Sequence, residues 1–162
     1  MNTVLTLNRF VLDYALKLAE GISEEQMDHQ PAPGMHSPRW ILGHLAIAYD
    51  LGASLLGGHP MTPSDWAKAF GPGSDPASCP SPPPSKQVLL NFLAAGNARL
   101  AELARGADPD KLAAPHPFKP LQQSMPTLAD LVAHLMTTHA TSHLGQLSAW
   151  RRLCGLPAVL GF

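Results

Sequence analysis

Four long segments of the chain carry apolar residues spaced three and four positions apart, and stretches rich in proline and glycine separate them. This spacing places the apolar side chains on one face of an α-helix. No segment shows the alternation of apolar and polar residues that is typical of a half-buried β-strand. The sequence therefore predicts an all-α protein with long helices at about residues 2–20, 37–56, 85–105 and 127–154.

Capping residues indicate where three of these helices begin. Ser37 precedes Pro38, which combines a side-chain cap with a residue whose fixed φ suits the first helical position. Ser85 occupies the equivalent place before the third helix. Thr127 is followed three residues later by Asp130, which predicts a capping box at the start of the last helix.

The connections between the predicted helices differ in length. Residues 22–34 allow one helical turn, and residues 108–126 contain five prolines and are predicted to be irregular. Residues 59–85 include a short helix at 65–70, yet antiparallel neighbours in a bundle need only a few linking residues. The expected fold is therefore a four-helix bundle with a long crossover between the second and third helices, as a single domain spanning residues 1–162.

Composition excludes several classes of function. Only 14% of the residues are charged and the net charge is -1, so no basic stripe is available for nucleic acid. No run of eighteen apolar residues predicts a membrane span. The two cysteines have no metal or redox spacing, and the N-terminal residues lack the order of a signal peptide. We expect a cytoplasmic protein with reduced thiols.

Histidines interrupt the apolar faces of two predicted helices. His44 shares a face with Trp40 in the second helix, and His139 and His143 share the apolar stripe of the fourth with Gln146. Two residues four positions apart lie about 40° apart around a helix and roughly 6 Å apart along it, so one ion can bind both imidazoles. His134, five positions before His139, is about 140° away and is predicted to point elsewhere.

Each of these histidines also has a simpler interpretation. A buried neutral imidazole can hydrogen-bond a backbone carbonyl or another side chain, and pairs with the spacing H-x-x-x-H also occur by chance. Spacing alone therefore leaves a metal site and a metal-free bundle both open. The four histidines in the connections are predicted to be solvated, with His36 close enough to the second helix to line the mouth of a site. They are His29, His36, His59 and His116.

Three blocks of the sequence resemble the DinB/YfiT-like superfamily of metalloenzymes. They are residues 22–34, residues 37–45 and residues 134–147, and the resemblance covers nearly the whole chain. Its most specific element is H-x-x-x-H-x-G-Q from His139 to Gln146. The resemblance implies a four-helix bundle, commonly a homodimer, with a divalent metal held by three histidines, here His44, His139 and His143. The family often has Arg or Ala where this chain has Leu144, which is predicted to lie on the helix surface.

The resemblance also implies a reaction class. Similar members include thiol-dependent S-transferases and a thiol-dependent isomerase, so we expect a small-molecule substrate and a low-molecular-weight thiol cosubstrate. The ion would be zinc or nickel, with iron, cobalt and manganese as alternatives. Neutral imidazoles leave the ion its full charge, so the expected nucleophile is a metal-bound thiolate or hydroxide. No catalytic residue is assigned beyond the ligands, and Trp40, Gln146 and His36 are candidates for the pocket wall. The alternative is a non-catalytic bundle that binds a metal or small ligand in a stress response.

Overall fold

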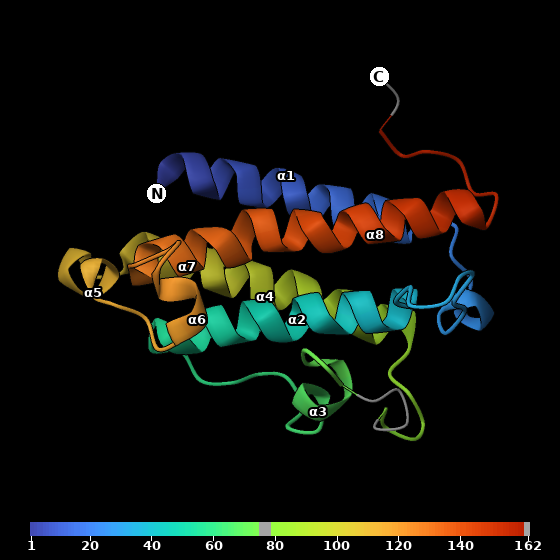
Figure 1. Cartoon of the computed structure of the whole chain (residues 1–162), viewed down its shortest axis with the longest axis horizontal. Helices are drawn as coiled ribbons and strands as arrows, with labels where there is room; N and C mark the ends of the chain where they lie inside the picture. Colours follow the sequence, from blue (N-terminus) through green and yellow to red (C-terminus); the bar gives the residue numbers. More distant parts are fainter. Residues whose placement is uncertain (75–78, 161–162) are drawn as a thin grey trace.

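The computed structural model describes residues 1–74 and 79–160 and contains four long helices that lie side by side (Figure 1). They are α1 (Asn2–Ala19), α2 (Pro38–Leu55), α4 (Lys86–Gly106) and a last helix made of α7 (Leu128–His134), a π-helical turn η3 (Leu135–His139) and α8 (Ala140–Leu153). The predicted all-α bundle is confirmed. None of the helices in the described ranges is both long enough and apolar enough to cross a bilayer.

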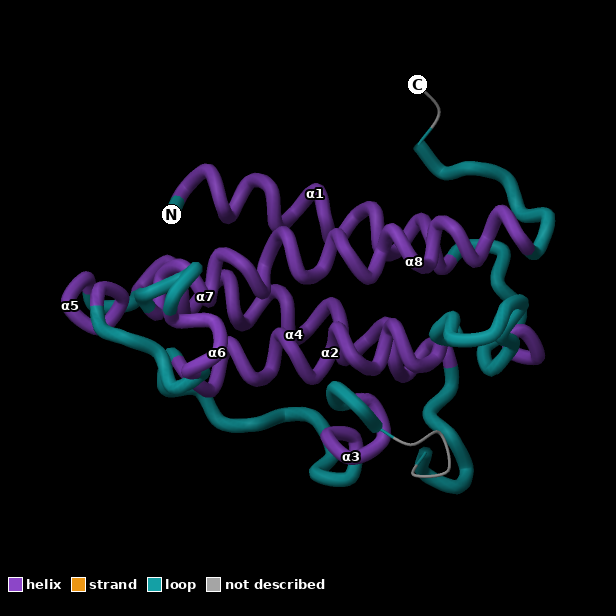
Figure 2. Tube along the Cα trace, in the orientation of Figure 1, coloured by secondary structure: helices purple, strands orange, loops and turns teal. Residues whose placement is uncertain are grey.

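The helices do not follow simple up-and-down order. In Figure 1, α1 and the last helix run from left to right, whereas α2 and α4 both run from right to left. Because α2 and α4 are parallel, the chain between them must return along the bundle, and Figure 2 shows this connection passing outside α2. It carries the short helix α3 (Trp66–Phe70). The predicted crossover is thus confirmed, while residues 75–78 of the connection lie outside the described residues.

Short helices occupy the smaller connections. The first connection forms the predicted single turn, η1 (Glu24–Gln26). Residues 108–126, which we predicted to be irregular, instead contain α5 (Pro109–Ala113) and α6 (Lys119–Gln122). Each of these helices has proline in its first turn, where the missing N–H has no helical partner to lose. The prolines that prevent a long helix therefore begin two short ones.

Helix α2 lies deepest in the bundle. Its fully buried side chains are at most 1% exposed, and they are Ile41, Leu42, Leu45, Ala46, Tyr49 and Ala53. The face that carries Trp40 and His44, which we predicted to be an apolar face of this helix, is instead its outer margin, and Leu51 on the same helix is 39% exposed. His44 is nevertheless only 5% exposed, because the crossover covers this margin.

The π-helical turn changes which side chains of the last helix face the core. An i→i+5 turn holds one residue more than an α-helical turn, so it rotates everything that follows by about 100°. As a result Ala140, Leu144 and Leu147 are all 0% exposed. Leu144 was predicted to be a surface residue and is fully buried, whereas Gln146 was predicted to face inward and is exposed. Both predictions were wrong because they assumed that the α-helical periodicity continues unbroken through this segment.

Three side-chain hydroxyls in and around the π-helical turn donate hydrogen bonds to backbone carbonyls. Thr137 donates from Oγ1 to the carbonyl of Ala133 at 2.6 Å, and Thr141 donates to the carbonyl of Thr137 at 2.8 Å. Ser142 donates to the carbonyl of Thr138 at 2.8 Å. These bonds give partners to backbone carbonyls around the turn, where the regular i→i+4 pattern is interrupted.

Asp50, near the end of α2, anchors the start of the crossover. Its carboxylate is 5% exposed and accepts hydrogen bonds from the backbone N–H of Met61 at 2.9 Å. The backbone N–H and the hydroxyl of Thr62 donate to the same carboxylate at 3.0 and 2.8 Å. One carboxylate therefore positions the chain as it leaves the bundle towards α3.

Replacing Asp50 with alanine is expected to lower the free energy of unfolding by about 2–4 kcal/mol, because the bonded N–H groups lose a charged acceptor. Urea denaturation would measure the change. Asp13→Ala, at an exposed position of α1, is the matched control and is expected to change stability by less than about 0.5 kcal/mol. Equal effects of the two substitutions would contradict an anchoring role for Asp50.

Candidate metal centre

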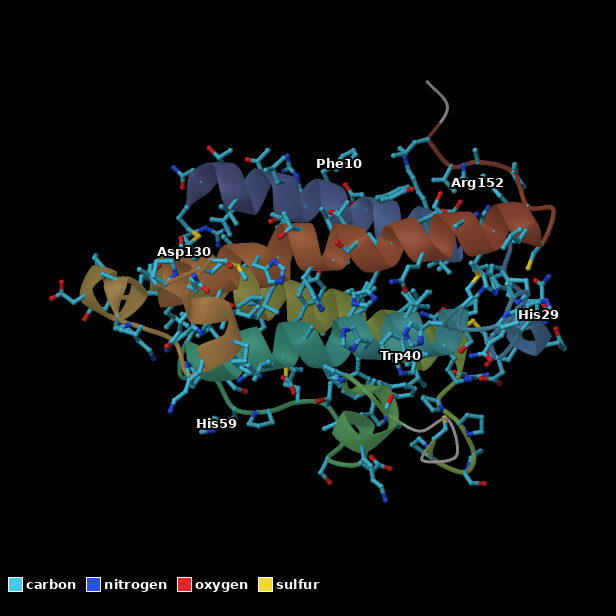
Figure 3. The ribbon with its side chains drawn as sticks, viewed as in Figure 1. Phe10, His29, Trp40, His59, Asp130 and Arg152 are labelled. Atoms are coloured by element: carbon cyan, nitrogen blue, oxygen red, sulfur yellow. The ribbon has the colours of Figure 1, made fainter. Side chains whose placement is uncertain are left out.

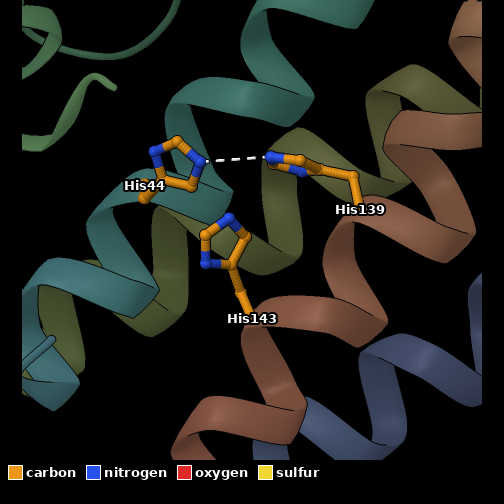
Figure 4. A group of neighbouring side chains, drawn as sticks. All are labelled: His44, His139 and His143. Atoms are coloured by element: carbon orange, nitrogen blue, oxygen red, sulfur yellow. Dashed lines mark hydrogen bonds between the residues drawn. The ribbon is translucent and has the colours of Figure 1, made fainter. Parts of the chain in front are cut away.

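Three histidines from two helices converge at one point (Figure 4). His44 comes from α2, His139 ends the π-helical turn and His143 lies one turn into α8. Each offers one ring nitrogen, and these nitrogens all lie within 4.8 Å of one another. The Nε2 atoms of His44 and His139 are 3.1 Å apart. Two nitrogens bound to one tetrahedral zinc ion would lie about 3.4 Å apart, so this pair is close to the spacing of shared ligands.

The crossover fixes the ring of His44. Its Nδ1 lies 2.7 Å from the carbonyl oxygen of Phe70, the last residue of α3. Because a carbonyl only accepts, Nδ1 of the neutral ring carries the hydrogen and Nε2 keeps its lone pair for a metal ion. Gly43 permits this contact, since a Cβ atom there would lie 2.6 Å from the ring of Phe70.

The imidazole of His44 is also held by aromatic stacking against one face of its ring. The ring of His44 stacks on Trp40 at a centroid distance of 4.6 Å and an angle of 8°. His36 stacks on Trp40 at 3.6 Å and 11°, and Trp40 donates from Nε1 to the hydroxyl of Ser74 at 2.7 Å. Two of the three pocket candidates from the sequence, Trp40 and His36, thus form a stacked series that ends at His44.

Burial keeps the three imidazoles uncharged. It lowers the pKa of His139 to about 3, and the neighbouring His143 and His44 add to this effect. Burial also lowers the pKa of His143 to about 4 and lowers the pKa of His44. At neutral pH the rings are therefore neutral, and their nitrogen lone pairs are available without loss of a proton.

The donor set fits a divalent ion. Among the described residues, the structure contains one group of three or more potential metal ligands, and it consists of these histidines without a carboxylate. The Nδ1 atoms of His139 and His143 are buried and have no hydrogen-bond partner. Both side chains are half-buried rather than fully buried, because the π-helical turn moves them to the flank of the core.

Gln146 lies at the rim of this centre. Its side chain is exposed, and it raises the pKa of His143 against the larger lowering by burial. Gln146 therefore neighbours the ring of His143 from the solvent side, rather than from the core side that we predicted.

His134 does not point away from the centre. The π-helical turn brings residues five positions apart into line, so the ring of His134 lies 5.6 Å from that of His139, at an angle of 61°. Its Nδ1 is 2.7 Å from the hydroxyl of Thr138. His134 is not a member of the three-histidine group, but it contacts one of the three rings. The predicted separation of 140° was wrong because it assumed an unbroken α-helix.

His134→Ala is expected to leave about one metal ion per chain and to weaken binding by roughly tenfold, as is usual for a residue that contacts a ligand without binding the ion. Titration against a chromophoric chelator would measure the affinity. His134→Phe keeps an aromatic edge against His139 and is expected to weaken binding less. A loss of metal as complete as in His139→Ala would make His134 a ligand.

The remaining histidines lie away from the centre. His29 and His59 are exposed, as predicted. His116, which we predicted to be solvated, is 1% exposed. Its Nε2 bonds the carbonyl of Met125 at 2.7 Å, and the N–H of Phe118 donates to its Nδ1 at 3.1 Å. It is a satisfied buried histidine that holds the connection between α5 and α7.

The family model of the DinB superfamily matches residues 8–147 of the chain. The match begins within α1 and includes all three histidines of the centre. A search among curated proteins finds no match to the chain.

Proposed function

The chain belongs to the DinB superfamily, and from this premise we propose that it is an enzyme that holds one divalent metal ion through His44, His139 and His143. The reaction that we propose is the transfer of a low-molecular-weight thiol to a small organic substrate, or a hydrolysis at the same centre. Zinc or nickel is the proposed ion, with iron, cobalt and manganese as alternatives. A homodimer is the proposed assembly.

The convergence of three neutral imidazoles supports this proposal more than any other observation. The Nε2 atoms of His44 and His139 meet at 3.1 Å, although the two residues lie 95 positions apart in the chain. A pair of buried imidazoles needs partners, and the unpartnered Nδ1 atoms of His139 and His143 indicate that hydrogen bonding within the protein does not satisfy this cluster.

A divalent ion among neutral nitrogen donors is a Lewis acid that lowers the pKa of a water or thiol bound to it. The residues of the chain contribute orientation and access. Phe70 and Trp40 hold the ring of His44 through its Nδ1 and its face, so its other nitrogen has a fixed direction. His139 and His143 are only partly buried, and we propose that a small molecule approaches the ion from their side.

The proposal predicts an activity that depends on the metal. Protein purified without an affinity tag would first be analysed for bound metals and then screened with thiols and electrophiles. Activity is expected to disappear with a chelator, return with a divalent ion and rise with pH through one ionisation whose midpoint changes with the metal. Activity that survives complete removal of metal would refute the proposal. Metal binding without turnover across the screen would favour the non-catalytic binding class.

A further inference from the structure

A cavity of about 650 Å³ lies beside Trp40 and Phe70, and none of the three histidines of the centre lines it. It lies between the first connection, the start of α2 and the crossover, and Met35, His36, Trp40, Phe70, Ser74 and Cys79 are among its lining residues. Two of these also contact His44, since Trp40 stacks on its ring and the carbonyl of Phe70 bonds its Nδ1. Figure 3 labels Trp40 on α2. The volume is typical of sites for small organic molecules.

Among the described residues that line the cavity, the only charged side chains are Asp28 and Arg39, and they are paired with each other. Arg39 donates from Nε and Nη2 to the two oxygens of Asp28 at 2.7 and 3.0 Å. Its Nη1 donates to Glu24 at 3.2 Å and to the carbonyl of Pro84. Every nitrogen of the guanidinium therefore already has a protein acceptor, and no cation remains to balance an anionic ligand.

The other walls of the cavity are apolar or neutral. Met35, Trp40 and Phe70 provide large apolar surfaces, and Ser74 provides a hydroxyl. Burial lowers the pKa of His36, so this imidazole is neutral at neutral pH. A carboxylate or phosphate that entered the cavity would lose water without gaining a counter-charge from any lining side chain, whereas an apolar body would gain from leaving water.

We propose that this cavity binds an uncharged, largely apolar or aromatic small molecule. None of the three histidines lines the cavity, and it is Nδ1 of His44, not its Nε2, that bonds the cavity residue Phe70. The proposed binding therefore does not rest on the proposed function.

Cys79 makes the occupancy of the cavity measurable. It lines the cavity and is half-exposed, and Cys154, at the end of α8, is a half-exposed thiol that does not line it. Alkylation of both thiols by iodoacetamide would be followed by peptide mass spectrometry in metal-free protein. Two probes that share a phenyl-naphthylamine body would be compared: neutral N-phenyl-1-naphthylamine and the anion 1-anilinonaphthalene-8-sulfonate.

The neutral probe is expected to slow alkylation of Cys79 at a concentration at least about tenfold lower than the anion requires, a difference of about 1.4 kcal/mol in binding. Alkylation of Cys154 is expected to stay unchanged. Met35→Lys places a cation in the cavity wall and is expected to reverse the order of the two probes. Met61→Lys, at an exposed position outside the cavity, is the matched control. If Met35→Lys does not fold, Gln30→Lys tests the same point from an exposed lining residue.

Protection of neither thiol, equal protection of both, or protection by the anion at the lower concentration would each overturn the inference. Failure of this inference can be distinguished from failure of the proposed function. A protein that binds no metal but shows selective protection of Cys79 would refute only the metal-dependent reaction. A protein that binds metal but shows no protection would refute only the assignment of the cavity.

Discussion

Protein with alanine in place of His139 is expected to contain less than about a tenth of the metal that the unaltered protein binds. The substitution removes one of three nitrogen donors, and it removes the one whose Nε2 meets that of His44 at 3.1 Å. Loss of a contact behind a ligand typically weakens metal binding by roughly 10–100-fold, so loss of a ligand should exceed that range. Elemental analysis and competition with a chromophoric chelator would measure content and affinity.

The metal-free form of this variant is expected to remain folded, which separates loss of a ligand from loss of structure. The imidazole of His139 is half-buried and its Nδ1 has no partner, so its removal should change the free energy of unfolding by no more than about 1 kcal/mol. His59→Ala, at an exposed position in the crossover, is the matched control and should retain the metal. If His139→Ala retained metal as well as this control does, His139 would not be a ligand.

Arg39→Ala is expected to lower the free energy of unfolding by about 2–4 kcal/mol. The guanidinium is 5% exposed and joins three separate parts of the chain: Asp28 and Glu24 in the first connection, Pro84 before α4, and α2 itself. Hydrogen bonds to charged groups contribute about 1.5–3 kcal/mol each. The two carboxylates are 49% and 65% exposed and regain water when the arginine is removed, which limits the total.

Urea denaturation of three variants would test this estimate. Arg39→Lys keeps the charge but cannot form the two parallel bonds to Asp28, so its stability is expected to lie between those of the unaltered protein and Arg39→Ala. Arg105→Ala, at an exposed position near the end of α4, is expected to change stability by less than about 0.5 kcal/mol. Similar midpoints for Arg39→Ala and Arg105→Ala would show that the buried guanidinium contributes little.

The positions of the long helices could be predicted from the sequence because their signals are local. Ser37 and Pro38 start α2, and the capping box of Thr127 and Asp130 starts α7, through bonds that span three residues. The long connection before α4 predicted the crossover because its length alone excludes a tight turn between antiparallel neighbours. The short helices α5 and α6 were missed because their prolines were interpreted as breakers rather than as first-turn residues.

The π-helical turn could not be predicted from apolar periodicity. One extra residue in the turn changes the direction of every later side chain by about 100°, which is why Leu144 is buried, Gln146 is exposed and His134 contacts His139. The run of hydroxyl residues around the turn is the one sequence signal that accompanies it. Such hydroxyls bond backbone carbonyls in ordinary helices too, so the signal is not specific.

By itself the sequence determined that His139 and His143 lie one helical turn apart, because α-helical geometry relates residues four positions apart whatever surrounds them. Only the tertiary structure decided that they meet His44, and that the carbonyl of Phe70 orients its ring. Every residue has a backbone carbonyl, so the sequence does not indicate which carbonyl will accept the hydrogen bond from His44. The pairing depends on the path of the crossover and on packing between two helices whose histidines, His44 and His139, lie 95 residues apart in the sequence. Apolar periodicity within one helix carries no information about that packing.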